Sequence, residues 1–410
     1  MAFNETTTAV ARFSFHDLRP FVGKSAAIKR PQEITHFSFD DQHVCHPLSD
    51  ASLRYYYPPI FGDPDAGSQP RFDLSKGLDT FVKYDETTDL HIDALLDTIE
   101  KYESQIGEKV DADIVTWRGM MTKETPFDGY GEFEMNAIKF EVGDYVCSHI
   151  CIFKGLGLKC VRYIEENKAP YFENLKNNQN TVPRQYGPHP QSTMMYWGYK
   201  FEVLSTLPRP WAECSRDEVE DRDNEVVDTH AQYCSIVRTG IGSHSIVLGG
   251  EVDAVKGEKP EGLDHSIPYV ELKTSENFRA NDSRAAEKFE KKMCRFWAQS
   301  FLLGVPTIII GFRSPHGILE RIEEWETQRI PGFVQNRGMR TWDGNVCINF
   351  ASAFLDFLKQ TVAGDGTWLI KRRKGAKEIT ISKTSDTQSP HVVTAAFRQH
   401  RTNLSSELAS

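Results

Sequence analysis

The strongest constraint on the fold is a pair of short segments in the middle third of the chain, in which apolar and charged residues alternate. Such alternation is typical of a β-strand with one packed face. Side chains two positions apart on a strand share a face, at a spacing of about 7 Å. Glu251 and Asp253 are therefore expected on one side of the first strand, and Glu271 and Lys273 on one side of the second. The two segments are residues 249–255 and 269–275.

If these two strands pair, three carboxylates and one ammonium group converge on a single patch. Three anions this close repel one another strongly unless a cation lies among them. Hard ions such as Mg²⁺ take oxygen ligands, commonly one or two carboxylates together with a substrate phosphate. A neighbouring lysine can orient a water molecule while the metal polarises a phosphoryl oxygen. The simpler alternative is a solvated strand face with cross-strand ion pairs, because such short strings are common in surface strands.

Composition limits the partners of such a site. The chain has 410 residues, of which 39% are hydrophobic and 26% charged, so two average domains or one large α/β domain are both open. The formal net charge is −10. This argues against a broad basic surface that grips long nucleic acid non-specifically, but not against a local basic pocket that takes a nucleic-acid end.

The eight cysteines are scattered, without Cys-x-x-Cys pairs. Reduced thiols of this kind favour the cytosol or the nucleus. Cys147, His149 and Cys151 alternate and would share a strand face like zinc ligands. No second Cys or His pair lies at ligand spacing, so buried free thiols are the better interpretation. The first residues lack signal-peptide regions, and the longest apolar run, residues 301–312, is too short to span a bilayer.

The elements around the two strands indicate the architecture most clearly. A polar helix is expected over residues 217–229 and a strand over residues 232–239. After the two segments described above, a helix is expected over residues 284–303, with N-cap candidates at residues 281–283. The continuous apolar run at residues 307–312 is typical of a central parallel strand covered on both faces. The resulting order is α-β-β-β-α-β.

Two further segments supply candidate site residues. A strand over residues 112–117 ends at Arg118, where a guanidinium is placed to fork onto a phosphate or to make a structural ion pair. Residues 194–202 are predicted to form a strand with Gly198 and Glu202 on one face. Glycine in a buried strand indicates a close approach to its backbone, and Glu202 would join the carboxylate patch.

The C-terminal third is less informative. Residues 319–327 have helical character, and residues 368–381 predict a hairpin around Lys374 and Gly375. The basic run of this hairpin is either a nuclear localisation signal or a solvated tip, and the tip is the favoured interpretation.

The α-β-β-β-α-β order, with Asp253 followed on the next strand by Glu271-x-Lys273, resembles the PD-(D/E)XK nuclease core. A fuller set of motifs resembles the DXO family of RNA 5′-end decapping enzymes, most closely its fungal nuclear branch, which partners a large 5′-to-3′ exoribonuclease. The resemblance covers roughly residues 30–383. The motifs are, in chain order, Trp117-Arg118-Gly119, Gly198-Tyr199-Lys200-Phe201-Glu202, Gly250-Glu251-Val252-Asp253, Glu271-Leu272-Lys273 and Gln299.

The resemblance implies one or two Mg²⁺ or Mn²⁺ ions. Asp253, Glu271 and the backbone carbonyl of Leu272 would hold them. Glu202 and Glu251 would contribute directly or through bound water. These five residues are the expected metal ligands. Paired metals supply what phosphodiester hydrolysis needs, because they neutralise charge on the phosphoryl oxygens.

The resemblance also assigns roles to the remaining motif positions. Lys273 would position the attacking water, Arg118 would bind the 5′-terminal phosphates, and Gln299 would help to orient the nucleophile or the scissile phosphate. The expected catalytic residues are Glu251, Asp253, Glu271 and Lys273. The expected substrate-binding residues are Arg118, Glu202, Lys273 and Gln299.

The helix that carries Gln299 has a local basic excess. Six basic residues stand against three acidic ones between positions 279 and 295, so this helix could guide an RNA backbone on an otherwise acidic protein. The basic residues are Arg279, Arg284, Lys288, Lys291, Lys292 and Arg295, and the acidic residues are Asp282, Glu287 and Glu290.

We therefore expect an α/β (α+β) fold, a single large domain with a mixed central sheet and a second antiparallel sheet around the nuclease-like core. Residues 1–30 are expected to form an N-terminal arm and residues 31–383 the catalytic domain, with its core at about residues 217–313. Residues 384–410 are rich in Ser and Thr, and we expect them to be disordered.

The leading hypothesis is a metal-dependent RNA 5′-end hydrolase of the nucleus that acts in mRNA 5′-end quality control. It would remove unmethylated caps, NAD caps, or pyrophosphate from 5′-triphosphate ends, and 5′-to-3′ exonuclease activity could follow. Each of these reactions is an attack by water at a phosphorus near the 5′ terminus. The expected partners are RNA 5′ ends and a nuclear exoribonuclease, and no membrane.

Two alternatives remain open. The chain could be a non-catalytic partner that stabilises an exoribonuclease. The proline-rich stretch at residues 207–211 would then be a docking patch, although a plain loop that packs Trp211 explains this stretch equally well. The carboxylate set speaks against a purely structural role, because an unpaired cluster destabilises the fold. Alternatively, the same nuclease core could act on DNA.

Overall fold

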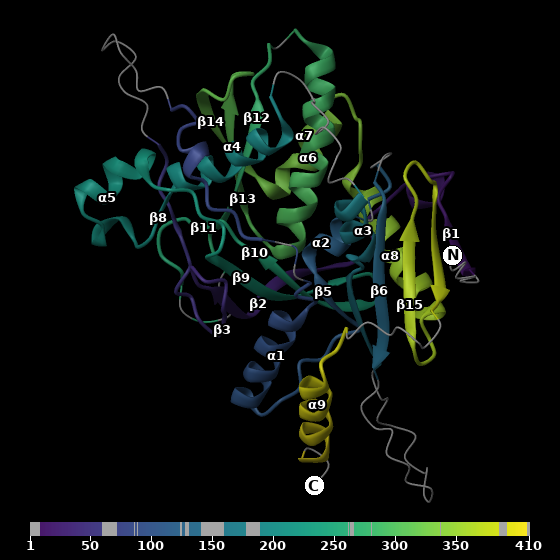
Figure 1. Ribbon diagram of the computed structural model, residues 1–410. Helices are drawn as coiled ribbons and strands as arrows, with labels where there is room; N and C mark the ends of the chain where they lie inside the picture. Colours follow the sequence, from purple (N-terminus) through teal and green to yellow (C-terminus); the bar gives the residue numbers. More distant parts are fainter. Residues whose placement is uncertain are drawn as a thin grey trace, which may run out of the picture.

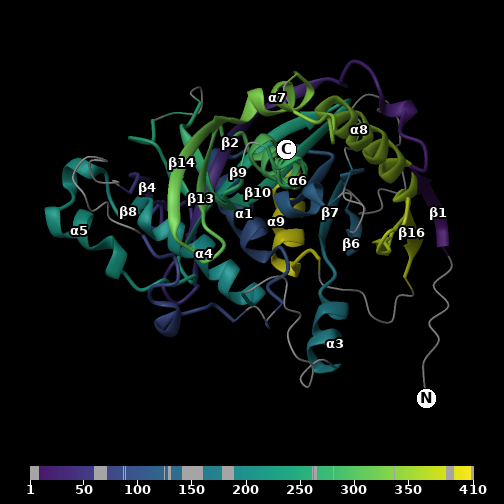
Figure 2. The ribbon, with the colours of Figure 1, turned by 90° about the horizontal axis from the view of Figure 1, so that it is seen from above.

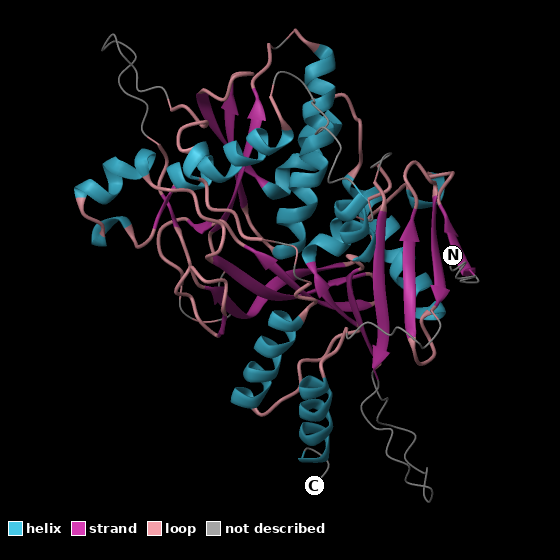
Figure 3. Cartoon of the chain, in the orientation of Figure 1, coloured by secondary structure: helices cyan, strands magenta, loops and turns pink. Residues whose placement is uncertain are grey.

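The computed structural model describes residues 9–59, 72–85, 87, 89–123, 125–127, 131–140, 160–177, 189–260, 262, 266–279, 281–336, 338–384 and 392–407. In this part of the chain, two β-sheets meet and helices cover their faces (Figures 1 and 3). The cysteine and histidine residues considered above as zinc ligands, Cys147, His149 and Cys151, lie outside the described residues. No described helix is long and apolar enough to cross a membrane.

The larger sheet has ten strands and is mixed. β10 pairs in parallel with β5, and β5 in parallel with β7, whereas the other neighbours are antiparallel. In spatial order the strands are β1 (Ala9–Ser14), β16 (Glu378–Lys383), β15 (Thr367–Arg372), β6 (Phe133–Phe140), β7 (Val161–Glu166), β5 (Ile114–Trp117), β10 (His244–Glu251), β9 (Gln232–Ile241), β2 (Ile28–Phe39) and β3 (Cys45–Pro47).

Helices cover both faces of this larger sheet because its central strands are apolar on both sides. On β10, Ile246 and Leu248 join the core beneath α6 and α8, whereas Val247 joins the core beneath α1 and α9. In Figure 1, α1 and α9 lie below the sheet and α6 and α2 above it. The described helices are α1 (Asp93–Ile106), α2 (Arg118–Thr122), α3 (Ala169–Asn177), α4 (Gln191–Leu204), α5 (Arg216–Glu220), α6 (Ser283–Leu303), α7 (Ile330–Asn336), α8 (Gly344–Thr361) and α9 (Ala395–Glu407).

The smaller sheet has six strands and lies between α4 and α6. Ile308 and Ile310 pack against the α6 side, whereas Ile309 packs with Phe201 of α4. The sheet is mixed rather than antiparallel, since β12 pairs in parallel with β13 and β4 with β11. Its strands, in spatial order, are β14 (Leu319–Glu326), β13 (Thr307–Arg313), β12 (Tyr269–Glu276), β11 (Ala254–Val255), β4 (Tyr55–Tyr56) and β8 (Thr206–Leu207).

The expected order β-β-β-α-β over residues 232–313 is confirmed. Strands β9, β10 and β12 precede α6, and β13 follows it as the buried parallel strand. Asp282 caps α6, because its side chain accepts a hydrogen bond from the amide of Ala285, and Gly304 ends the helix in the left-handed conformation. The preceding polar helix is shorter than expected, consisting of α5 and a short 3-10 turn.

The strand predicted over residues 194–202 is wrong. This segment belongs to helix α4, and Trp197, Phe201 and Leu204 lie on its buried side at helical spacing. Its tyrosine and tryptophan residues favour strands in isolation, but the helix buries them against the smaller sheet. The helical character predicted for residues 319–327 is also wrong, because β14 completes the edge of that sheet.

Both ends of the chain contribute to the fold more than expected. The predicted N-terminal arm includes β1, which pairs with β16 at the edge of the larger sheet. The predicted disordered tail contains helix α9, whose Phe397 is fully buried against Tyr163. Glu103 of α1 anchors α9, since it is paired with Arg401 at 2.8 Å and with His400 at 3.1 Å.

We predict that Phe397→Ala lowers the free energy of unfolding by about 3–5 kcal/mol, because it opens a cavity between α9 and the larger sheet. Gln399 is an exposed residue of the same helix, so the matched change Gln399→Ala should stay within about 0.5 kcal/mol. Chemical denaturation of both variants measures the difference. Equal stabilities would mean that α9 does not pack on the sheet.

Candidate active site

The candidate site lies where β10 leaves the larger sheet and the chain enters the smaller one. Glu251 is the last residue of β10, and Asp253 lies between β10 and β11. Ala254 of β11 pairs with Val270 of β12 in antiparallel register. Asp253 therefore falls beside Glu271, the next residue of β12. The two expected strands meet through β11 rather than by pairing directly.

Four side chains form a continuous set of polar contacts at this junction. The amide of Leu272 donates to Asp253 Oδ2 at 2.6 Å. Lys273 Nζ lies 2.6 Å from Glu271 Oε1 and 3.8 Å from Asp253 Oδ2. Arg118 Nη1 donates to Glu271 Oε2 at 3.1 Å. Glu271 is only 1% exposed, so both of its oxygens are matched with cations inside the protein.

Glu202 and Glu251 border the same site from the side of a cavity of about 300 Å³. Glu202 comes from the last turn of α4 and Glu251 from the end of β10. The cavity is mainly acidic near these residues, and Arg54 is its basic member. The residues of its wall nearest to the site are Arg54, Tyr199, Glu202, Glu225, Glu251 and Asp253.

The carboxylates on the cavity side, unlike Glu271, have raised pKa values, because nearby cations do not fully offset their burial and mutual repulsion. Loss of hydration, together with the neighbouring Asp253 carboxylate, raises the pKa of Glu251 to about 7. Burial also raises the pKa of Asp253, against the attraction of Lys273. The pKa of Glu202 is raised well above its ordinary value by burial and by Asp253. Although its neighbours remove part of its hydration, Glu251 still opens onto the cavity and the solvent, so a cation can reach it.

Glu271 behaves in the opposite way. Burial alone would raise its pKa, but the charges of Arg118 and Lys273 outweigh burial and lower the pKa to about 2. The pKa of Lys273 is correspondingly raised, since its attraction to Glu271 exceeds the effect of burial. Lys273 therefore remains protonated and can donate hydrogen bonds, but it cannot act as a base at neutral pH.

Two glycines allow the surrounding elements to approach the site. A Cβ atom on Gly250 would lie 3.2 Å from Arg118 Cβ and 3.1 Å from Leu303 Cδ1. A Cβ atom on Gly249 would lie 2.7 Å from the ring of Trp117. Both glycines therefore bring the end of β5 and the end of α6 directly onto β10.

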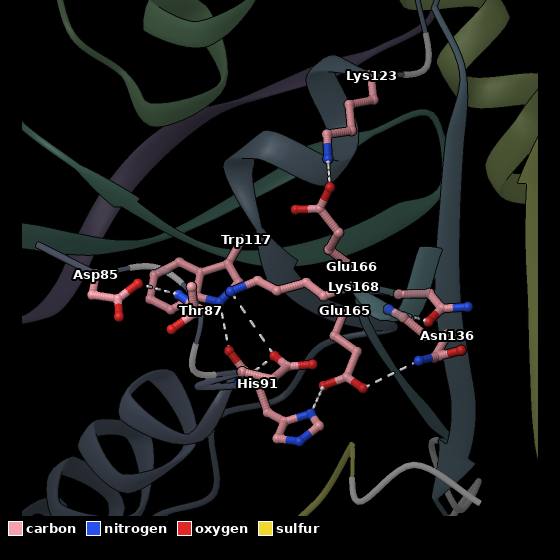
Figure 4. A network of polar contacts seen from close by, with 12 residues as sticks. Asp85, Thr87, His91, Trp117, Lys123, Asn136, Glu165, Glu166 and Lys168 are labelled. Carbon is pink, nitrogen blue, oxygen red and sulfur yellow. Dashed lines mark hydrogen bonds and ion pairs between the residues drawn. The ribbon is translucent and has the colours of Figure 1, made fainter. Parts of the chain in front are cut away.

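The end of β5 is further held by the polar network in Figure 4. Trp117 Nε1 donates to the carbonyl of His91 at 3.4 Å. His91 Nδ1 lies 3.1 Å from Glu165 Oε2, and Asn136 donates to the other oxygen of Glu165 at 3.4 Å. This network orients Trp117, and Arg118 follows Trp117 directly in the chain.

Gln299 lies on α6, one helical turn before Leu303, and therefore shares the face that approaches Gly250 and Arg118. On the same helix, Lys292 donates to the carbonyl of Thr274 at 2.6 Å. Burial, together with nearby cations, lowers the pKa of Lys292 to about 8. The basic side of α6 thus faces β12 just beyond Lys273.

The structure brings together Arg118, Asp253, Glu271 and Lys273 by direct contacts. It places Glu202 and Glu251 at the adjoining cavity. Arg54 of that cavity was not predicted from the sequence, although its Nε donates to Thr206 Oγ1 at 3.1 Å. An arginine within an aromatic extended stretch was the only signal that could have indicated it.

The site fits a hard divalent cation by its donor chemistry. Its carboxylate and carbonyl oxygens are the ligands that Mg²⁺, Mn²⁺ and Ca²⁺ prefer. The raised pKa of Glu251 reflects negative charge that such an ion would neutralise. In the described part of the chain, no three His, Cys, Asp or Glu side chains are arranged around a common metal position. A metal would compete with Arg118 and Lys273 for Glu271.

Comparison with known proteins identifies the family. The model of the RAI1-like PD-(D/E)XK nuclease family matches residues 29–151 and 153–398, which is most of the chain. The chain belongs to this family. The expected PD-(D/E)XK nuclease core and α/β fold are confirmed by this match.

Similar proteins of the RAI1-like family cover nearly the whole chain. A protein of Emericella nidulans named decapping nuclease RAI1 is 45% identical over 391 residues, 95% of this chain and 98% of its own length. The protein of the same name from Gibberella zeae is 44% identical over 396 residues, covering 96% and 97%. The crystal structure of Candida albicans Rai1 in complex with pU5 and Mn²⁺ has a TM-score of 0.76 at 26% identity, covering 96% of this chain and all of that one.

We predict that Mn²⁺ binds more tightly as the pH rises from about 6 to about 8. A carboxyl group must lose its proton before it binds a metal. Because the pKa of Glu251 is about 7, metal binding must displace its proton below that pH, at a cost of up to about tenfold per pH unit. Titration calorimetry at several pH values measures this dependence.

The raised pKa of Glu251 also makes the stability of the metal-free protein depend on pH. A carboxyl group whose pKa is raised by folding stabilises the fold below its unfolded pKa of about 4.3, and this contribution is lost as the pH rises through about 7. The gain in melting temperature on adding Mn²⁺ should therefore be larger at about pH 8 than at about pH 6. A pH-independent gain would contradict the assignment of Glu251 as a ligand.

Proposed function

We propose that the protein is a metal-dependent RNA 5′-end hydrolase, a decapping nuclease. The observation that carries this proposal is the junction of the two sheets, where Lys273 lies close to both Glu271 and Asp253 and Glu251 lies at an adjoining cavity. The names of the relatives support it, since they are called decapping nuclease RAI1. The complex of Candida albicans Rai1 with pU5 and Mn²⁺ supports an RNA substrate and a divalent ion.

The residues of the site suit water attack on a phosphorus atom. Asp253, Glu271 and the Leu272 carbonyl would hold Mg²⁺ or Mn²⁺, with Glu202 and Glu251 beside them, and the ion would polarise a phosphoryl oxygen. Lys273 stays protonated, so it can hold the attacking water by a hydrogen bond.

Two further residues would act on the substrate. Arg118 carries a permanent charge that is paired with Glu271 in this structure, and it would turn to the 5′-terminal phosphates when Glu271 binds the metal. Gln299 approaches from α6 and would orient the nucleophile or the scissile phosphate.

We propose a substrate range that includes unmethylated caps, NAD caps and 5′-triphosphate ends. One site can serve all three because each reaction cleaves a phosphate bond near the 5′ terminus. A complex of Scheffersomyces stipitis Rai1 with (3′-NADP)⁺ and calcium ion, at a TM-score of 0.76, supports a nicotinamide dinucleotide end as a ligand. Exonucleolytic trimming would follow at the same metal site.

We predict that Asp253→Asn lowers the turnover of 5′-modified RNA more than about 100-fold, since the loss of an outer-shell partner alone costs about 10–100-fold. A panel of capped, NAD-capped and triphosphorylated RNAs, incubated with Mg²⁺ or Mn²⁺ and read by product mass, measures turnover. Glu220→Gln, on the exposed face of α5, is the matched control and should retain activity.

Wild-type rates in Asp253→Asn would refute the site. Matched DNA ends in the same assay separate the RNA enzyme from a DNA nuclease of the same core.

We further propose that the protein works in the nucleus with a 5′-to-3′ exoribonuclease. Trp211 is 61% exposed and lies parallel to Tyr57, with ring centroids 6.5 Å apart. The guanidinium of Arg222 lies over the Tyr57 ring, 5.0 Å from its centroid. It also donates hydrogen bonds to the carbonyls of Tyr57 and Leu204. An exposed tryptophan on a rigid base is the kind of anchor that protein interfaces use.

We predict that Trp211→Ala abolishes co-purification of the exoribonuclease while RNA decapping by the isolated protein is retained. Tyr171→Ala is the matched control, because Tyr171 is an aromatic residue of α3 that is 47% exposed and α3 lies apart from β8 and α5 (Figure 2). Tandem purification followed by a decapping assay measures both properties. Retained partner in Trp211→Ala would place the interface elsewhere.

A further inference from the structure

A ring of polar side chains, two of them buried tyrosines, links the two sheets beside the cavity, whose wall includes Tyr233. Its members come from three strands and one loop. Glu33 lies on β2 and Tyr233 on β9, both in the larger sheet, whereas Tyr269 lies on β12 of the smaller sheet. Lys259 comes from the connection between β11 and β12. The ring therefore crosses the boundary at which the candidate site is built.

The hydrogen bonds of this ring run in one direction. Lys259 Nζ donates to the Tyr233 hydroxyl at 2.6 Å. The two tyrosine hydroxyls are 2.9 Å apart, and the Tyr269 hydroxyl donates to Glu33 Oε2 at 2.7 Å. Lys259 lies 2.8 Å from Glu33 Oε1 and closes the ring. Since Tyr233 accepts from the lysine and Tyr269 donates to the carboxylate, Tyr233 donates to Tyr269.

The two tyrosines of the ring are buried, and its two charged members, Glu33 and Lys259, are partly exposed and paired with each other. Tyr233 and Tyr269 are 2% and 3% exposed. Burial would raise the pKa of Glu33, but hydrogen bonds from His36 and Lys259 and the lysine charge lower it to about 2. Hydrogen bonds to a buried charged group are stronger than those between neutral groups. The position of Tyr269 relative to the larger sheet is therefore defined closely.

Both tyrosines are tied to the strands that carry the carboxylates. The carbonyl of Tyr233 accepts from the amide of Val252 at 3.0 Å, and Val252 separates Glu251 from Asp253. Tyr269 pairs with Val255 and lies two residues before Glu271 on the same strand. A shift of Tyr269 relative to Tyr233 would thus change the separation between the acidic residues of β10 and those of β12.

We propose that the hydroxyl bridge from Tyr233 through Tyr269 to Glu33 positions the metal-binding carboxylates, by setting the spacing between the two sheets. Tyr233, Tyr269 and Glu33 are positioning residues, since they act through Asp253 and Glu271. This inference rests on the proposed metal-dependent function. Metal sites need ligand distances held within a few tenths of an ångström, and a junction between two sheets requires a link of its own.

The test compares two donors to the same oxygen. Ser235 and Tyr269 both donate to Glu33 Oε2, at 2.6 and 2.7 Å, but Ser235 belongs to the larger sheet whereas Tyr269 reaches across the junction. Tyr269→Phe removes the link between sheets, and Ser235→Ala removes a bond within one sheet. Tyr163→Phe serves as a second control, because Tyr163 is a buried tyrosine of β7 whose hydroxyl has no hydrogen-bond partner in the described structure.

We expect Tyr269→Phe to bind Mn²⁺ about 10-fold more weakly than the wild-type protein, as typical for the loss of an outer-shell partner. Ser235→Ala and Tyr163→Phe should bind Mn²⁺ as the wild-type protein does, even where Ser235→Ala lowers the melting temperature. Calorimetric titration of the full chain with Mn²⁺ alone, well below the melting temperature of each variant, measures affinity independently of turnover.

The outcomes separate this inference from the proposed function. If the wild-type protein does not bind Mn²⁺, the proposed metal-dependent function is wrong. If the wild-type protein binds Mn²⁺ and Asp253→Asn weakens binding, but Tyr269→Phe matches the wild-type affinity, the hydroxyl bridge is only structural and the inference is wrong. Equal weakening in Tyr269→Phe and Ser235→Ala would likewise overturn it, since it would trace the effect to Glu33 rather than to the link between sheets.

Discussion

Electrostatic repulsion among buried carboxylates is the constraint on which this structure depends. Glu271 is stable as an anion because Arg118 and Lys273 contact it, at 3.1 and 2.6 Å. The pKa values of Glu251 and Asp253 are instead raised, chiefly by loss of hydration, even though Lys273 lies 3.8 Å from Asp253. A divalent cation bound at this junction, as proposed, would neutralise the charge that Glu251 and Asp253 carry when they are ionised.

The rest of the architecture brings these acids together and keeps them there. The larger sheet supplies Glu251, the smaller sheet supplies Glu271, and the chain crosses between them at Asp253. Gly249 and Gly250 remove the side chains that would otherwise hold β5 and α6 away from β10. Helices α4 and α6 cover the two faces of the smaller sheet, and Leu302 and Leu303 of α6 also pack in the core of the larger sheet.

Much of the core was predictable from local patterns. Alternating residues indicated β10 and β12, a continuous apolar run indicated β13, and an N-cap marked the start of α6, because these signals act within one strand or one helical turn. The strand faces indicated Glu251, Asp253, Glu271 and Lys273, whereas Glu202, predicted on a strand, in fact lies on helix α4. The family match agrees with the resemblance that those motifs carry. The metal, the partner and the individual residue roles remain proposals.

Tertiary structure decided what local pattern could not. Residues 194–202 are rich in aromatic residues, which suit strands, yet the segment is helical because a helix buries Trp197 and Phe201 against β12 and β13. Helix α9 forms in a polar tail because its partners, Glu103 and an apolar core against the larger sheet, are supplied by distant segments of the chain. The sequence by itself indicated which side chains are candidate metal ligands and which segments carry them, but not whether each segment is a strand or a helix. Only packing between distant segments decided that two sheets share the site, because the hydrogen bonds of Tyr269 with Tyr233 and Glu33 join residues up to 236 positions apart.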